Sequence, residues 1–119
     1  MHIYSFEKLE TWQLARNFRK EVHLLVKKFP KDETFGLTSQ IKRSSCSIGD
    51  CLAEGSARIT AKDKAHFIVM AYSSAIETIN HLITAFDLND ITEDEYRIFR
   101  LKLDELTNKL NALRKAVLR

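Results

Sequence analysis

Apolar residues recur at steps of three and four along most of the chain, which is the spacing of one face of a helix. The first such stretch predicts a helix from about Phe6 to Phe29 (residues 6–29), because Pro30 follows it and proline disfavours helical geometry in the residue before it. Three more stretches predict helices at about 33–58, 61–87 and 93–117. Three glycines and one proline are too few for the many turns of an all-β domain, so the chain favours long helices joined by short loops.

Capping signals mark the starts of the last two predicted helices. Thr60 is followed three residues later by Asp63, and Thr92 by Glu95, which makes a full capping box. Four helices joined by loops this short must run antiparallel to their neighbours. We therefore predict an all-α fold, an antiparallel up-and-down four-helix bundle that forms a single domain over residues 1–119.

The second predicted helix has an inward face of unusually small residues. Gly49 and Gly55 each weaken a helix by up to about 1 kcal/mol relative to alanine, so close approach of another helix is the better reason for them. The inward line of this helix reads Leu37, Ile41, Ser44, Ile48, Cys51 or Leu52, and Gly55. The third helix is expected to bury a broad apolar face: Ala65, Ile68, Tyr72, Ala75, Ile76, Ile79, Leu82, Ile83 and Phe86.

A polar line runs beside the apolar line of the second helix, and the third helix carries a similar one. These two lines hold Gln40, Arg43, Ser47, Asp50, Glu54 and Arg58, and then Ser73, Glu77, Asn80 and Thr84. Both lines can be solvated faces, with Glu54 and Arg58 as an ordinary pair worth about 0.3 kcal/mol. Alternatively, close helix approach draws them out of water, and they then need one another as partners. The candidate members of such a structural network are Gln40, Arg43, Asp50, Glu54, Gly55, Arg58 and Glu77.

Charge allows a nucleic-acid partner without requiring one, because the formal net charge is only +3 at pH 7. Residues 1–30 nevertheless hold six Lys or Arg against three acids. Our candidate nucleic-acid-binding residues are Arg16, Arg19, Lys20, Lys27, Lys28, Lys42 and Arg43. Only Tyr4 and Phe35 look like loop aromatics that could stack on bases. Lysine and arginine also form the normal solvent face of any helix, so a protein-interaction scaffold remains the alternative.

Sequence motifs for catalysis or cofactor binding are absent. A di-iron site in a four-helix bundle needs two Glu-x-x-His motifs, and the nearest match is Asp63-x-x-His66. No phosphate-binding or dinucleotide fingerprint is present, and the helical serines have no positioned base. We therefore expect no enzymatic activity, no metal and no cofactor.

The chain is expected to be cytoplasmic and to have no membrane partner. No apolar stretch approaches the roughly 18 residues that a membrane span requires, and the first residues lack the pattern of a secretory signal. Cys46 and Cys51 lie five residues apart in one predicted helix, where they point about 140° apart. That geometry does not suit a disulfide, so we expect both to be small buried hydrophobic residues.

Several motifs together resemble a known family, the four-helix-bundle proteins encoded within intervening sequences of bacterial 23S rRNA genes. The Ala-Glu-Gly-x-x-Arg block after Gln-x-x-Arg is the most specific part. The resemblance rests on Phe6-x-x-Leu9-x-x-Trp12-x-x-Ala15, Phe29-Pro30, Glu33-x-x-Gly36-Leu37-x-x-Gln40-Ile41-x-Arg43, Ser47-Ile48, Ala53-Glu54-Gly55-x-x-Arg58, Phe67, Ala71, Ser73 or Ser74, and Glu77. Gly49 and Cys51 depart from the pattern, because the family tends to carry Pro and Asn there.

The resemblance carries expectations about assembly and function. It implies a homopentameric ring without catalytic activity. It also implies a likeness to the accessory bundle proteins of diversity-generating retroelements, whose basic surfaces engage nucleic acid and a reverse transcriptase. The partners implied are other copies of this chain, RNA or DNA, and a nucleic-acid-processing protein. We therefore expect a non-enzymatic pentamer that binds nucleic acid, in the form of RNA or of a ribonucleoprotein. The alternative is a protein–protein interaction scaffold without a nucleic-acid role.

Overall fold

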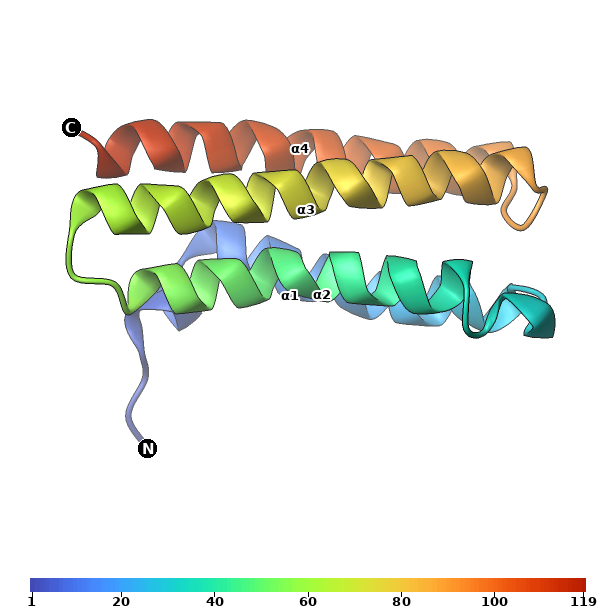
Figure 1. Ribbon diagram of the computed structural model, residues 1–119, viewed down its shortest axis with the longest axis horizontal. Helices are drawn as coiled ribbons and strands as arrows, with labels where there is room; N and C mark the ends of the chain where they lie inside the picture. The colour runs from blue at the N-terminus through green and yellow to red at the C-terminus, as the bar shows by residue number, and fades with distance from the viewer.

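The computed structural model describes residues 1–119 as four antiparallel helices without strands (Figure 1). The helices are α1 (Glu10–Leu25), α2 (Leu37–Ser56), α3 (Ala61–Asp87) and α4 (Glu93–Val117). Both α1 and α3 pack against α2 and α4, so α1 and α3 lie diagonally across the bundle from each other. The all-α, four-helix bundle predicted from the sequence is confirmed.

The first helix is shorter than the predicted range of 6–29. Ser5–Lys8 form a separate 3-10 turn, which the Glu7 carboxylate closes by accepting a hydrogen bond from the Tyr4 N–H at 2.7 Å. Leu9 then adopts an extended conformation with φ −76° and ψ 120°, so α1 begins only at Glu10. At the other end the chain tightens into a second 3-10 turn, Val26–Lys28, a common way for a helix to finish.

The second helix also starts later than predicted, at Leu37 instead of residue 33, and ends at Ser56 instead of residue 58. Lys31–Glu33 form a 3-10 turn, and the backbone of Gly36 is not helical. The Glu33 carboxylate accepts a hydrogen bond from the Leu37 N–H at 3.2 Å. This bond satisfies one of the amide groups that the start of a helix leaves without a partner.

The last two helices occupy the ranges 61–87 and 93–117 and begin at side-chain caps. The Thr60 hydroxyl accepts from the Asp63 N–H at 3.1 Å. The Thr92 hydroxyl accepts from the Glu95 N–H at 3.1 Å, while the Glu95 carboxylate accepts from the Thr92 N–H at 2.8 Å. Both reciprocal bonds of the capping box in the fourth helix are therefore present.

The core runs along the bundle axis and draws on all four helices, with fully buried side chains such as Val22, Ile41, Leu82 and Leu103. The predicted inward line of the second helix is buried throughout. For the third helix the prediction was partly wrong, because Ile76, Ile83 and Phe86 are exposed. Smaller side chains take their place in the core, because they let α2 and α4 pack closely against α3. These are Ala71, Thr78 and Ala85.

Acid should remove a contribution of Glu95 to stability. A hydrogen bond from Lys28 (2.6 Å) and another from the Thr92 backbone hold the pKa of Glu95 below its ordinary value of 4.5. A carboxylate whose pKa is lowered in the folded state stabilises the fold at pH values above its ordinary pKa. This stabilisation is lost as the pH falls through the lowered pKa.

The variant that tests this contribution is Glu95→Gln, which keeps a capping side chain but loses the charge. Both members of the ion pair are partly exposed, so solvent limits the expected loss at pH 7 to about 0.5–1 kcal/mol of unfolding free energy. Urea unfolding of both proteins between pH 7 and pH 3 should show the difference shrinking below about pH 4.5. A difference that stays constant with pH would rule out the charge as its source.

Candidate nucleic-acid interface

A groove between α1 and α2 gathers basic side chains, and we call it the basic groove. Residues 16, 19, 20, 23 and 27 follow helical spacing, which places them along one side of α1 and of the Val26–Lys28 turn that continues it. Cys46 joins them from α2. The residues that line the hollow itself are Arg19, Lys20, His23, Leu24, Lys27 and Cys46.

Five of the seven cations predicted to bind nucleic acid make no salt bridge within the chain: Arg16, Arg19, Lys20, Lys27 and Lys42. The other two have acidic partners on neighbouring helices. Lys28 pairs with Glu95 at 2.6 Å, and Arg43 pairs with Glu77. Lys28 and Arg43 therefore connect helices and have part of their charge neutralised, whereas the five unpaired cations are available to an external anion.

The Trp12 ring lies close to the guanidinium groups of two of the unpaired arginines. Its ring centroid lies 5.6 Å from the Arg16 guanidinium carbon and 6.0 Å from that of Arg19, within the range of cation–π attraction. The Trp12 side chain is only 9% exposed. Gly49 of α2 leaves room beside this group, since a Cβ there would lie 3.5 Å from the Arg19 guanidinium. The arginines are thus positioned, while the ring beneath them is not accessible for stacking.

Cys46 is half-buried within the basic groove, which corrects the expectation that both cysteines are buried; Cys51 is buried. Burial raises the pKa of the Cys46 thiol, and the Asp50 carboxylate raises it further. Arg19 of α1 and Lys42 of α2 act in the opposite direction, so both charges lie near this sulfur. The thiol is therefore protonated at neutral pH and sits between cations from two helices.

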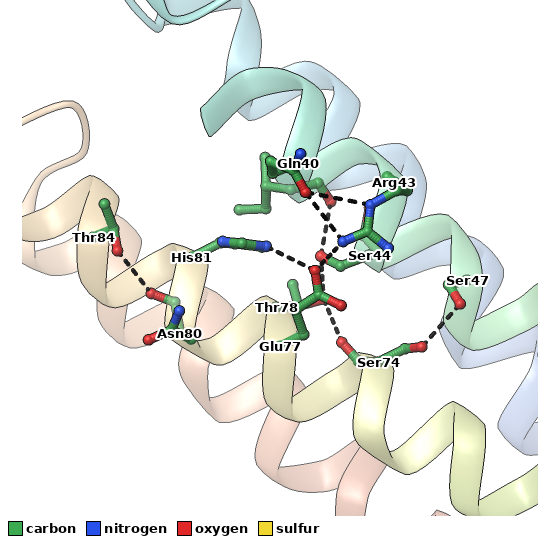
Figure 2. Close-up of polar contacts among 12 residues, drawn as sticks. Gln40, Arg43, Ser44, Ser47, Ser74, Glu77, Thr78, Asn80, His81 and Thr84 are labelled. Carbon is green, nitrogen blue, oxygen red and sulfur yellow. Dashed lines mark hydrogen bonds and ion pairs between the residues drawn. The ribbon is translucent and has the colours of Figure 1, made fainter. Parts of the chain in front are cut away.

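Polar side chains also connect α2 and α3 (Figure 2). The Arg43 guanidinium donates to the Gln40 side-chain oxygen at 3.1 Å and to the Glu77 carboxylate. His81, one turn after Glu77, reaches the same carboxylate at 3.1 Å. Three members of the predicted network, Gln40, Arg43 and Glu77, are brought together here. His81 of α3 joins them through the same carboxylate.

Two pairs of hydroxyl groups bridge the same helices (Figure 2). The Thr78 hydroxyl donates to the Ser44 hydroxyl at 2.8 Å, and the hydroxyls of Ser47 and Ser74 are 2.8 Å apart. Ser44 and Thr78 are fully buried, so each hydroxyl needs the other in place of water. The small serines let the helices approach closely enough for these bonds to form.

The remaining predicted network residues do not join this cluster. Asp50 and Glu54 are exposed and make no salt bridge. Arg58 lies over the ring of Phe67, 4.5 Å from its centroid, so the predicted pair between Glu54 and Arg58 is not formed. Gly55 contributes space: a Cβ at this position would lie 2.7 Å from the Phe67 Cβ.

The two loop aromatics considered for base stacking lie outside the residues that line the basic groove. Phe35 is 96% exposed between α1 and α2, and Tyr4 is 61% exposed near the N-terminus. No three His, Cys, Asp or Glu side chains come together in a way that could hold a metal ion. None of the four helices combines the length and the apolar character needed to cross a bilayer.

Comparison with known proteins places the chain in a family and gives a solved structure with a similar fold. Residues 7–112 match the family model described as 23S rRNA-intervening sequence protein. A crystal structure from Bacteroides thetaiotaomicron, of a protein with unknown function from the S23 ribosomal protein family, superposes with a TM-score of 0.82. The two chains are 23% identical over 88% of this chain and 98% of the other, which indicates a shared fold. No curated protein matches the sequence.

Proposed function

Because the chain belongs to the 23S rRNA-intervening sequence protein family, we propose that it is a non-enzymatic helical bundle that binds nucleic acid, and RNA in particular. The basic groove between α1 and α2 is the binding surface. The observation that carries this proposal is the set of five cations without acidic partners along the two helices. Phosphate groups supply the missing negative charge, and the release of their counterions favours binding.

The length of the cation row suits a nucleic-acid strand. Residues 16 to 27 span about 16 Å along α1 and the Val26–Lys28 turn that continues it, at about 1.5 Å per residue. One strand of a duplex carries a phosphate about every 3.4 Å along its axis, so several phosphates lie within that span. Trp12 is buried beneath the arginines and cannot stack on a base. Binding therefore depends on backbone charge and is largely independent of base sequence.

Self-association is the second part of the proposal, and an apolar row on α3 favours it. The row consists of Val69, Ile76 and Ile83, which lie seven residues apart on one side of the helix and are 39–45% exposed although they are large and hydrophobic. Such a row marks an interaction surface. Because α3 lies diagonally opposite α1, copies that meet through α3 leave the basic groove open. The resemblance noted from the sequence implies five subunits, and each ring then presents five grooves to one nucleic acid.

Light scattering on the purified protein tests the assembly: a mass several times that of the 13.8 kDa chain is expected, and a monomer would contradict it. If the groove binds no nucleic acid, the apolar row of α3 takes its place as the proposed interaction surface. The protein is then a protein–protein scaffold.

Cys46 provides a chemical probe of the groove itself. Near pH 9.0, which is the ordinary pKa of a cysteine thiol, enough thiolate forms for alkylation to be followed by mass spectrometry. We expect a structured RNA to slow alkylation of Cys46 severalfold once its binding is saturated, because the RNA lies over the groove. The buried Cys51 serves as the internal control, since its rate should not change. Equal Cys46 rates with and without RNA would exclude the groove as the binding surface.

A further inference from the structure

Both chain termini lie at one end of the bundle (Figure 1). An apolar cavity of about 190 Å³ lies at this end. We call it the end cavity. It lies between the N-terminal segment, the last turn of α2, the first turns of α3 and the last turns of α4. Its apolar wall consists of Phe6, Leu9, Leu52, Ile68, Leu113 and Val117.

The end cavity exists because α1 stops short of its neighbours. α1 begins at Glu10, and α4 continues past this level to Val117. The place that two more turns of α1 would fill is taken by the Ser5–Lys8 turn and the extended Leu9. This thinner segment covers the opening but does not fill it, so a hollow remains between the four elements.

Charge around the end cavity favours an anion. Lys64 is the only charged residue in its lining, and it makes no salt bridge within the chain. The Ser56 hydroxyl is already used, because it donates to the Ala53 carbonyl at 2.6 Å. An apolar hollow with one unpaired cation matches a ligand that has an apolar tail and a single negative charge.

We propose that the end cavity binds a small monocarboxylate, with its tail inside the hollow and its carboxylate paired with Lys64. A cavity of about 150 Å³ lined by apolar side chains binds benzene, so a hollow slightly larger than that accommodates about six to eight carbons. The site is separate from the basic groove, and the inference does not depend on the nucleic-acid proposal.

A chain-length series tests the fit of the tail. Butanoate, hexanoate, octanoate and decanoate are titrated into protein with labelled methyl groups, and the signals of Leu52, Ile68 and Leu113 are followed by NMR. We expect affinity to rise about fourfold for each buried methylene and to stop rising once the hollow is full. If these methyl signals do not respond, or if affinity keeps rising through decanoate, the cavity is not the binding site.

Lys64→Gln tests the charge, with hexan-1-ol as the neutral ligand. The variant should bind hexanoate about tenfold more weakly, because a charged hydrogen bond is lost, and should bind hexan-1-ol as before. Lys62→Gln is the matched control, since Lys62 is exposed and lies outside the lining. Equal hexanoate affinity in the wild type and in Lys64→Gln would overturn the assignment of Lys64.

Val117→Phe tests the space itself. The larger side chain occupies the hollow, so binding of both hexanoate and hexan-1-ol should be lost while the melting temperature is maintained. Circular dichroism establishes that the variant is folded before the titration. A folded Val117→Phe protein that still binds both ligands would contradict the proposal.

Discussion

Replacing Gly55 with alanine is expected to lower the free energy of unfolding by about 2 kcal/mol, although alanine is the better helix former. The new Cβ would lie 2.7 Å from the Cβ of Phe67, an atom bonded directly to the α3 backbone. It cannot move aside as the tip of a flexible side chain would, so α2 and α3 must separate. Overpacking of this kind costs about 1–3 kcal/mol or more, against a gain of up to about 1 kcal/mol in helix propensity.

Gly49→Ala is the matched control on the same helix. Here the Cβ would meet the Arg19 guanidinium at 3.5 Å and the Trp12 indole nitrogen at 3.6 Å, which are ordinary contacts. The variant should therefore gain up to about 1 kcal/mol from helix propensity alone. Urea unfolding followed by circular dichroism measures both variants. Effects of the same sign at the two glycines would contradict the distinct roles assigned to them.

Neutralising three cations of the basic groove together is expected to weaken RNA binding about 100-fold at moderate salt. The variant is Arg19→Gln, Lys20→Gln and Lys27→Gln. Each substitution removes a phosphate contact, so the slope of log affinity against log salt should also become less steep by about one for each. Fluorescence anisotropy with a labelled structured RNA measures the affinity and the slope.

A second triple variant separates the groove from overall charge. Lys8→Gln, Lys62→Gln and Lys115→Gln change the net charge by the same amount, and none of these lysines lines the groove or makes a salt bridge. We expect its affinity to fall less than fivefold, through long-range charge alone. An equal loss in the two triple variants would mean that RNA responds to net charge and not to this surface.

The sequence predicted the starts of α3 and α4 because their signals are local. Thr60 and Thr92 each cap a helix through a partner only three residues away. The start of α1 could not be predicted in the same way, since Phe6 and Leu9 continue the apolar spacing of the helix. Both residues do pack against the core, but from a 3-10 turn and an extended residue. Apolar periodicity identifies the buried side and does not identify the kind of turn.

The sequence also predicted only part of the candidate site. The cations of α1 were evident from the sequence, but their partners were not, because Glu95 lies 67 residues from Lys28 and Glu77 lies 34 residues from Arg43. The exposed face of α3 was missed for another reason. That helix carries more apolar residues than one buried face can hold, so spacing alone could not choose Ala71, Thr78 and Ala85 over larger neighbours.

The most direct test of the nucleic-acid role is the affinity of the wild-type protein for a structured RNA, measured from about 50 to 200 mM salt. Five phosphate contacts predict a slope of about −4, and hence a loss of affinity of more than about 100-fold across this range. Steep weakening of that size would support electrostatic binding through the groove. No binding at the lowest salt, or an affinity that salt leaves unchanged, would contradict the account.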